Sequence, residues 1–449
     1  MKIQRIGLEK INGPLVYIKT PKDAIFDEQV ELALPNGETR LGNIVTLSED
    51  FTVIQVYEGT NGMSCKGVKT EFTGSPLKLK LSKDMLGRIF DGAGRPIDGL
   101  GEINVQTERE IGGEPINPVA REYPKNFIET GISAIDGLMT LIRGQKLPIF
   151  SGSGINHNKL TEKIIRQANI KDESGFAIVF GLIGAEYETV EFFRKSFEEN
   201  GILDKVVTFQ NLSNDPSIER ILTPNVALTC AEYLAFDLDM QVLVILTDMT
   251  AYAEALREVS TLKGEIPSRK GYPGYLYSDF ASIYERAGKI RGKKGSITQI
   301  PILTMPNDDI SHPIPDITGY ITEGQIVLSR ELSQKGIDPP INILDSLSRL
   351  MKDGIGEKYT RKDHREIADQ LFTSYSKVQE VRALAKVLGE ADLSETDKKY
   401  LEFGKAFEEK WLNQEVMESR TIEQTLDLAW EILKILPESE WSKIDTLKK

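Results

Sequence analysis

The pattern of hydrophobic and polar positions divides the chain into three stretches, and the first reaches to about Gly74. Short runs of strand-forming residues are separated there by turn dipeptides, of which Asn12-Gly13 and Asn36-Gly37 are the clearest hairpin signals. We therefore expect an N-terminal β-barrel over residues 1–74. A barrel removes free sheet edges, so a role in forming an assembly ring and a role as an ordinary capping domain both stay open.

The second stretch, residues 75–354, alternates apolar β-branched runs with helical patterns. A Gly- and Pro-rich segment at 90–101 is expected to be a linker into it. The expected strands are 145–150, 176–183, 205–209, 241–246 and 297–303, and the expected helices are 188–200, 225–236 and 251–262. This alternation predicts an α/β domain with a mostly parallel sheet covered on both faces.

The third stretch, residues 355–449, has a helical composition. Aromatic side chains recur at three- and four-residue steps, at Tyr400, Phe403, Phe407 and Trp411. Such a stripe is typical of the core of a helical bundle. Thr421 with Gln424 forms a capping-box pattern ahead of an apolar run, and Ser394 with Asp397 resembles one.

Composition and charge exclude several classes of protein. Of 449 residues, 55 are Lys or Arg and 68 are Asp or Glu, which gives a net charge of −13. An acidic chain is a poor general binder of nucleic acid, because duplex affinity depends on neutralising phosphates. Cys65 and Cys230 cannot form a disulfide framework, and no apolar run approaches the roughly 18 residues that span a bilayer.

Candidate chemistry lies after the expected strand that ends at Phe150, where an α/β domain binds phosphates. A Walker loop reads G-x-x-x-x-G-K-[ST]. With Ser151 at the first glycine, Asn156 takes the second glycine, His157 the lysine and Asn158 the hydroxyl position. The members of this degenerate loop are Ser151, Gly152, Ser153, Gly154, Asn156, His157 and Asn158. Three interpretations stay open: a turn and helix cap, a weak nucleotide site without hydrolysis, or an unrelated Gly/Ser turn.

Other positions are candidates for metal and water chemistry. Asp248 follows the strand 241–246, one residue later than the simplest Walker B alignment, and we expect it to cap the next helix. Glu186 is adjacent to Ala185, which holds the place where a water-activating glutamate is expected, so a dedicated hydrolytic carboxylate is doubtful. His312 lies between prolines and is interpreted as loop structure. We expect no metal site, since neither the histidines nor the cysteines have ligand spacing.

These segments together resemble the B subunit, the non-catalytic beta chain, of V-type and archaeal-type rotary ATPases. The matching pieces are FSGSGINHNKL at 150–160, NDPSIERILTPNVALTCAEYLAF at 214–236, VLVILTDMTAYAEALREVS at 242–260, GYPGYLYSDFASIYERAGKIRG at 271–292, PILTMPNDDISHPIPDITGYITEGQI at 301–326 and SLSRL at 346–350. The resemblance covers essentially the whole chain. One departure is Ile155-Asn156 in place of a Leu-Pro pair in the loop.

The resemblance implies a RecA-like, P-loop-type central domain in an alternating hexamer with catalytic A subunits. It also implies a central rotor shaft, peripheral stalk subunits and a membrane sector that moves protons or sodium ions. The complex would lie as a peripheral sector on the cytoplasmic side of a membrane. ATP or ADP with magnesium would bind at the interface with the catalytic subunit, and no nucleic acid is implied.

The same resemblance assigns an arginine finger to Arg349, which would reach across the subunit interface to the neighbour's ATP. Ser348 and Tyr320 are expected to line that interface. Without the family, Arg349 would be one surface arginine among many.

Two other functions are alternatives for this fold class. A self-sufficient hexameric ATPase such as an export motor would hydrolyse ATP alone, and the missing lysine at His157 is against it. A ring helicase or termination factor needs an electropositive channel with stacking aromatics, which the acidic composition disfavours.

Overall fold

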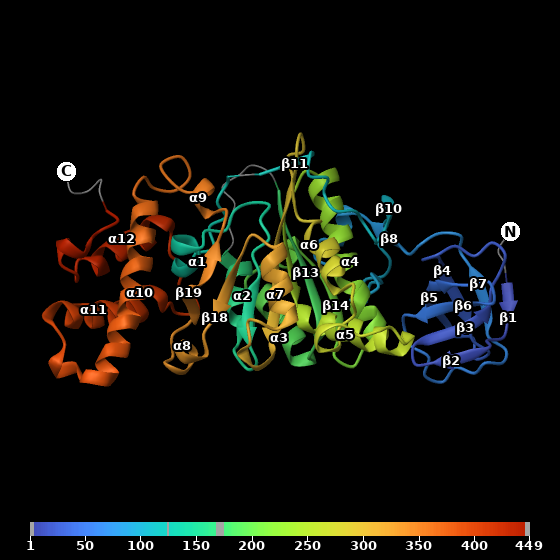
Figure 1. The fold of residues 1–449 in the computed structure, drawn as a ribbon. Helices are drawn as coiled ribbons and strands as arrows, with labels where there is room; N and C mark the ends of the chain where they lie inside the picture. The colour runs from blue at the N-terminus through green and yellow to red at the C-terminus, as the bar shows by residue number, and fades with distance from the viewer. Residues whose placement is uncertain (1–3, 124, 168–174, 445–449) are drawn as a thin grey trace. The chain divides into compact units, whose positions relative to one another are not determined.

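The computed structural model describes residues 4–123, 125–167 and 175–444. The chain divides into two compact units, and each is made of two stretches of sequence. The first unit comprises Met1–Ile116 and Ala177–Arg286, and the second comprises Asn117–Phe176 and Ala287–Lys449. Figure 1 shows their elements coloured along the chain.

The N-terminal part of the first unit is a seven-stranded antiparallel sheet, in the order β1-β7-β4-β5-β6-β3-β2. Its strands are β1 (Gln4–Ile6), β2 (Lys10–Asn12), β3 (Leu15–Lys19), β4 (Gln29–Ala33), β5 (Thr39–Leu47), β6 (Phe51–Val56) and β7 (Lys69–Phe72). Both predicted hairpins are confirmed, since Asn12 pairs with Leu15 and Ala33 pairs with Thr39. Gly37 takes a φ of 89°, a left-handed conformation that glycine adopts without steric cost.

Alternating side chains of these strands form one hydrophobic core. Val16, Val30, Ile44, Ile54 and Val56 are all fully buried in it. Strand-forming, β-branched residues therefore face inward at every second position, which is the arrangement that a half-buried strand requires.

The rest of the first unit is an α/β layer. Strands β15, β13, β14 and β9 follow one another in the sheet order, and β14 pairs in parallel with both β13 and β9. Helix α4 packs against α5, β14 and β15. The elements are β8 (Lys78–Leu81), β9 (Ile89–Asp91), β10 (Thr107–Glu110), β13 (Phe176–Ala185), α3 (Tyr187–Glu199), β14 (Val206–Leu212), α4 (Ser217–Glu232), β15 (Gln241–Thr247), α5 (Met249–Lys263) and α6 (Leu276–Tyr284).

Two expectations for this unit are corrected. The segment 90–101 is not wholly a linker, because Phe90 lies in β9, is buried and stacks on Phe209 with ring centroids 5.3 Å apart. Its hydrogen-bonding partner β14 is distant in sequence, so the Gly- and Pro-rich surroundings concealed a three-residue strand. The helix expected at 225–236 begins earlier, at Ser217, and contains Pro224.

The second unit contains another parallel group of strands, in which β12 pairs with β17 and with β18. Strand β19 closes this group antiparallel to β18. The elements are β11 (Arg121–Glu122), α1 (Ser133–Leu138), β12 (Ile149–Gly152), α2 (His157–Gln167), β16 (Gly288–Ile290), β17 (Ser296–Met305), α7 (Pro313–Ile321), β18 (Gly324–Leu328), α8 (Arg330–Gln334), β19 (Ile341–Ser348) and α9 (Met351–Gly354). The strand expected at 145–150 begins only after Pro148, which has no N–H to donate to a ladder.

Helices at the carboxyl end of the chain complete this unit. They are α10 (His364–Leu388), α11 (Glu395–Ala406), a π-helical turn at Phe407–Leu412 and α12 (Ile422–Leu433). The predicted aromatic stripe is confirmed as core, since Phe403, Phe407 and Trp411 are fully buried and Tyr400 is 5% exposed. Thr421 and Gln424 form the predicted capping box at the start of α12. The fold is therefore an N-terminal β-barrel, a central α/β domain with a mostly parallel sheet and a C-terminal helical domain.

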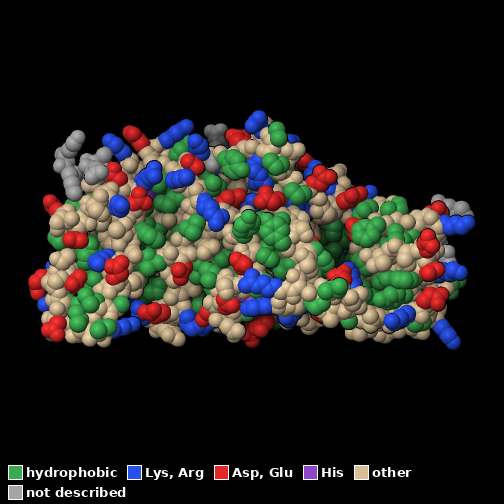
Figure 2. Space-filling model, in the orientation of Figure 1, with side chains coloured by type: hydrophobic (Ala, Val, Ile, Leu, Met, Phe, Trp, Pro, Cys, Tyr) green, Lys and Arg blue, Asp and Glu red, His purple; other side chains and the backbone are tan. Residues whose placement is uncertain are grey.

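Charged side chains of both signs are interspersed over the face drawn in Figure 2. No large area of that face carries a single sign of charge. Within the described residues, no helix has the length and apolarity needed to cross a bilayer.

Candidate functional site

The degenerate loop connects the end of β12 to the start of α2, as a phosphate-binding loop does. Ser151 and Gly152 still belong to the strand, and the helix begins at His157. The buried Ser151 hydroxyl donates to the carbonyl oxygens of Gly152 at 3.3 Å and Ile155 at 3.2 Å. Ser151 thus ties the two ends of the turn together, and Gly154 allows the turn with a φ of 78°.

The side chains at the motif's chemical positions do not fit Walker-type binding of a magnesium nucleotide. His157, at the lysine position, is the first residue of the helix and is half-buried. Asn158 has no hydroxyl to contact a metal, and Asn156 accepts a hydrogen bond from the Lys159 N–H at 3.3 Å. The loop therefore keeps the shape of a phosphate-binding turn but lacks its cation and its metal-binding hydroxyl.

An ion pair braces this loop, and no local pattern in the sequence indicates it. Arg330 Nε donates to Asp308 Oδ2 at 2.6 Å, and Arg330 Nη2 donates to Asp308 Oδ1 at 2.8 Å. Nη2 also donates to the Ser153 carbonyl oxygen at 2.7 Å. The Arg330 guanidinium lowers the pKa of Asp308, because a bidentate cation favours the charged carboxylate.

The Asp308 carboxylate lies directly against Gly152. A Cβ atom at Gly152 would overlap Asp308 Oδ1 and would lie 3.0 Å from Arg330 Nη2. Asn307 and Asp308 both take left-handed backbone conformations, with φ of 56° and 57°, which cost side-chain-bearing residues about 1–2 kcal/mol each. The structure accepts this strain in the turn that aims the carboxylate at the loop.

Arg349 lies immediately after β19, and its side chain is exposed. Its Nη1 donates to the Thr322 carbonyl oxygen at 2.6 Å, and both terminal nitrogens lie within 3.5 Å of the Gly319 carbonyl oxygen. Among the described residues, no carboxylate lies within ion-pair distance of Arg349. Its guanidinium is therefore oriented by neutral carbonyl groups and keeps an uncompensated charge.

The structure brings the three predicted interface residues to one region of the second unit. The Ser348 hydroxyl accepts a hydrogen bond at 2.8 Å from Nε2 of Gln145, whose side chain is buried in the interior of the unit. Tyr320 is 77% exposed and follows Gly319, to which Arg349 bonds. None of the hydrogen bonds of Arg349 reaches the degenerate loop, so the two candidate sites are separate features.

Arg349 also lines a surface pocket of about 570 Å³. Lys352 and Arg365 add two further cations to its wall, and Phe372 adds an aromatic side chain that is 43% exposed. Sequence reasoning missed Lys352 and Arg365. The helical spacing of Arg365 and Phe372 places both on one face of α10, but nothing local indicates that this face adjoins Arg349.

The other residues considered for metal or water chemistry lie at or just before the starts of helices. Asp248 caps α5 as predicted, since its carboxylate accepts a hydrogen bond from the Thr250 N–H at 2.7 Å. Glu186 precedes α3 and is exposed. His312 lies in the bend before Pro313, the first residue of α7, in agreement with its interpretation as loop structure. Within the described part of the chain, no group of three His, Cys, Asp or Glu residues could hold a metal ion.

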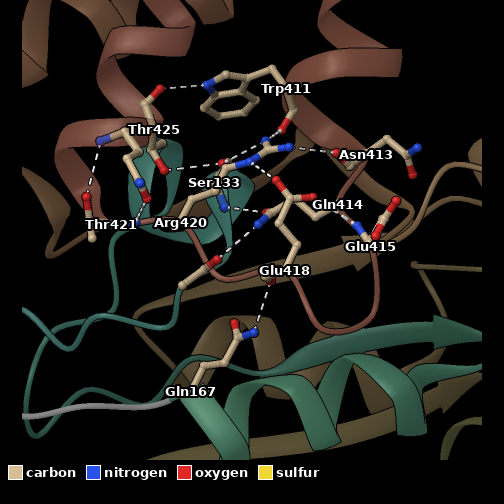
Figure 3. Close-up of polar contacts among 12 residues, drawn as sticks. Ser133, Gln167, Trp411, Asn413, Gln414, Glu415, Glu418, Arg420, Thr421 and Thr425 are labelled. Carbon is tan, nitrogen blue, oxygen red and sulfur yellow. Dashed lines mark hydrogen bonds and ion pairs between the residues drawn. The ribbon is translucent and has the colours of Figure 1, made fainter.

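Helix α2, which follows the degenerate loop, also forms hydrogen bonds with residues 413–420, the segment that precedes α12 (Figure 3). The Gln414 amide accepts a hydrogen bond from the Ser133 N–H at 2.7 Å and donates to the Gly131 carbonyl oxygen at 3.0 Å. On α2, Lys163 donates to the Glu415 carbonyl oxygen at 2.9 Å and Gln167 donates to the Glu418 carbonyl oxygen at 3.0 Å. Helix α2 and the helical domain are thus joined by partly buried hydrogen bonds.

Comparison with protein families assigns all three parts of the chain. Residues 131–348 match the nucleotide-binding domain of the ATP synthase alpha/beta family, and residues 9–74 match the β-barrel domain of that family. Residues 353–449 match the C-terminal domain of V- and A-type ATP synthases.

Individual relatives extend over nearly the whole length of the chain. A V-type ATP synthase beta chain of Clostridium tetani is 59% identical over 447 residues, which cover 99% of this chain and 97% of the relative. A V-type ATP synthase beta chain of Thermotoga neapolitana is 60% identical over 439 residues, which cover 98% and 95%. Among solved structures, the ATP synthase subunit NeqB from Nanoarcheaum equitans matches with a TM-score of 0.74 and 39% identity, over 94% of this chain and 98% of that chain. With such identity over almost its full length, the chain belongs to the family of V-type ATP synthase beta chains.

Proposed function

We propose that this chain is the non-catalytic B subunit of a V/A-type rotary ATPase. It would form a hexameric ring with catalytic A subunits, and the ring would couple ATP hydrolysis or synthesis to transmembrane movement of protons or sodium ions. Within the ring, Arg349 of this chain would act in trans on the nucleotide of a neighbouring A subunit.

One contrast within the chain carries this proposal. The loop at 151–158 has the turn of a phosphate-binding loop without its lysine or hydroxyl, so this chain lacks the groups that would hold a magnesium nucleotide of its own. Arg349, by comparison, is exposed, is oriented by the Gly319 and Thr322 carbonyl groups and has no carboxylate partner among the described residues. A chain with this pair of features serves a reaction that takes place on another subunit.

The chemistry of phosphoryl transfer explains why an arginine suits this task. Negative charge is spread over the phosphoryl oxygens and the leaving group in the transition state, and a guanidinium offers several fixed donors to those oxygens. In nucleotide hydrolases, such an arginine contributes about 10³ to 10⁵ in rate. The carbonyl contacts of Arg349 leave Nε and part of Nη2 available as donors.

The proposed assembly implies further partners. ATP or ADP with magnesium would be held at the interface mainly by the catalytic subunit. A central rotor shaft and peripheral stalk subunits would contact the ring, which would lie as a peripheral sector on the cytoplasmic side of the membrane. The −13 charge of the chain agrees with the expected absence of nucleic acid among its partners.

The test is hydrolysis by a ring reconstituted from this chain and a catalytic partner that has an intact Walker loop. Arg349→Ala should leave ring assembly intact and lower kcat by about 10³ or more. Arg349→Lys should recover little, because a point charge lacks the forked donor geometry. The matched control is Arg291→Ala, which removes another exposed arginine of the same unit and should leave hydrolysis unchanged. Undiminished hydrolysis by an assembled Arg349→Ala ring would show that the finger assignment is wrong.

A further inference from the structure

The pocket beside Arg349 is formed by two structural parts of the second unit. One wall is the corner from the end of β19 through α9, which contributes Arg349 and Lys352. The other wall is the face of α10 that carries Arg365, Asp369 and Phe372 at steps of four and three residues. Residues at this spacing lie on one side of a helix, so all three side chains border the same hollow. We refer to this hollow as the Arg349 pocket.

The charges of the Arg349 pocket are unbalanced. Arg349, Lys352 and Arg365 bring three positive charges, and Asp369 brings one negative charge. Some other cations on this unit are paired, such as Arg330 with Asp308 and Lys377 with Glu380. Within the described residues, none of the three pocket cations makes an ion pair. A net positive pocket on a chain of charge −13 indicates an anionic partner that this chain does not itself supply.

The floor of the Arg349 pocket is apolar. Phe372 is 43% exposed, and Leu138 and Ile355 also line the hollow. An exposed phenylalanine next to aliphatic side chains, surrounded by cations, has the composition of a protein-binding hot spot with a polar rim. A bare phosphate would use the cations but not this floor.

We propose that the Arg349 pocket docks an acidic segment of the neighbouring catalytic subunit, with one apolar side chain of that segment against Phe372. The identity of the neighbour rests on the proposed function, whereas the charge and apolarity of the docked segment follow from the pocket. Docking here would fix the β19–α9 corner against the neighbour and would thereby set the distance from Arg349 to the neighbour's nucleotide. Lys352 and Arg365 are in this view positioning residues.

The first experiment measures association of this chain with the catalytic partner as a function of salt. Lys352→Glu with Arg365→Glu should raise the Kd at least about tenfold, because both substitutions place like charges opposite the acidic segment. The salt dependence of the Kd should also become weaker. The matched control is Lys358→Glu with Lys362→Glu, which makes the same change in net charge at two exposed lysines outside the pocket lining and should leave the Kd within about twofold.

A set of variants separates this proposal from the arginine finger. Arg349→Ala should abolish most hydrolysis at saturating partner and should raise the Kd less than the double charge reversal, because it removes one pocket cation and reverses none. The double charge reversal should raise the Kd and lower hydrolysis at saturating partner only in part, because Arg349 is retained but less well positioned. A Kd unchanged by the double reversal, with a raised KM for ATP in the ring, would overturn the docking proposal and would indicate that the pocket meets the nucleotide. Failure of Arg349→Ala to reduce hydrolysis would refute the proposed finger and leave the docking result standing by itself.

A second measurement does not depend on charge. A photo-crosslinking phenylalanine analogue at position 372 should crosslink to the catalytic partner in the assembled ring, and the crosslinked peptide should contain Asp or Glu. The same analogue at Thr373, which is exposed on α10 outside the pocket lining, should crosslink much less. A crosslink to a peptide without acidic residues, or no crosslink to the partner, would contradict the proposal.

Discussion

At the scale of single residues, Gly152 is the point where the degenerate loop meets the Asp308–Arg330 pair. The pair joins the turn after β17 to the start of α8, and Arg330 also donates to the Ser153 carbonyl oxygen of the loop. The pair therefore fastens the loop to two other elements. Because the Asp308 carboxylate fills the space in which a side chain at position 152 would begin, only glycine fits there.

Gly152→Ala is therefore expected to destabilise the chain by about 1–3 kcal/mol, since the new methyl group must displace a charged pair held by three hydrogen bonds. Denaturant unfolding of the purified chain measures this change. The neighbouring Ser153→Ala, at an exposed position, should cost less than about 0.5 kcal/mol. Equal stability of the two variants would show that the pair moves aside freely.

A second residue-scale prediction concerns His364, which is fully buried between the Thr360 hydroxyl and the Gly137 carbonyl oxygen. Burial lowers the pKa of His364 from 6.5 to about 4. Between pH 6.5 and pH 4, His364 is protonated in the unfolded chain but mostly neutral in the folded chain. The free energy of unfolding should therefore fall by about 3 kcal/mol as the pH drops from 6.5 to 4.

The nearby Asp136 acts in the opposite direction, because burial raises its pKa to about 7 and the folded chain then binds a proton first. Comparison with His364→Gln separates the two groups. The wild-type curve minus the variant curve should keep the downward slope toward acid pH, while the contribution of Asp136 cancels. A flat difference curve would contradict the prediction.

At the scale of elements, the 413–420 segment joins the helical domain to helix α2. Gln414 is 1% exposed, and its amide satisfies both the Ser133 N–H and the Gly131 carbonyl oxygen (Figure 3). Arg420 adds hydrogen bonds to the Ser133 hydroxyl at 3.2 Å and to the Trp411 carbonyl oxygen at 2.9 Å. These bonds make α1, α2 and the π-helical turn parts of one connected structure.

Gln414→Ala should cost about 1–3 kcal/mol, because it leaves the buried Ser133 N–H without a partner, while the Gly131 carbonyl oxygen still accepts from the Arg420 N–H at 3.0 Å. Amide hydrogen exchange should show faster exchange at Ser133 and along 413–420. The control on the same segment is Glu415→Ala, whose side chain is exposed while its backbone carbonyl still accepts from Lys163. Unchanged protection in Gln414→Ala would mean that the segment is held by other contacts.

These elements also show what the sequence can and cannot predict. The stripe from Tyr400 to Trp411 and the Thr421 capping box were predicted correctly, because their signals repeat within a few residues of one another. The contact between Gln414 and Ser133 joins positions 281 residues apart, and the ion pair between Arg330 and Asp308 joins positions 22 apart across a strand. Such pairings arise from the packing of separate elements, and one sequence holds no local pattern for them.

At the scale of the whole molecule, the chain has the architecture of a nucleotide-binding protein without the loop chemistry. The purified chain alone is therefore expected to release no phosphate from magnesium ATP above background. The ring formed with the catalytic partner is the positive control, and a phosphate-release assay compares them at equal chain concentration. Magnesium-dependent hydrolysis by the isolated chain would favour the self-sufficient ATPase over the proposed subunit.

The anchoring of Arg349 on the Gly319 and Thr322 carbonyl groups has a consequence for timing. A free arginine side chain has up to about 2 kcal/mol of rotamer entropy to lose when it is immobilised, and here much of that loss has occurred within the subunit itself. In the proposed ring, the guanidinium would arrive already aimed, so its placement would follow the α7 backbone rather than a search by the side chain. Any small displacement of α7 would then move the guanidinium toward or away from the neighbour's nucleotide, and would thereby permit or prevent hydrolysis on the neighbouring subunit.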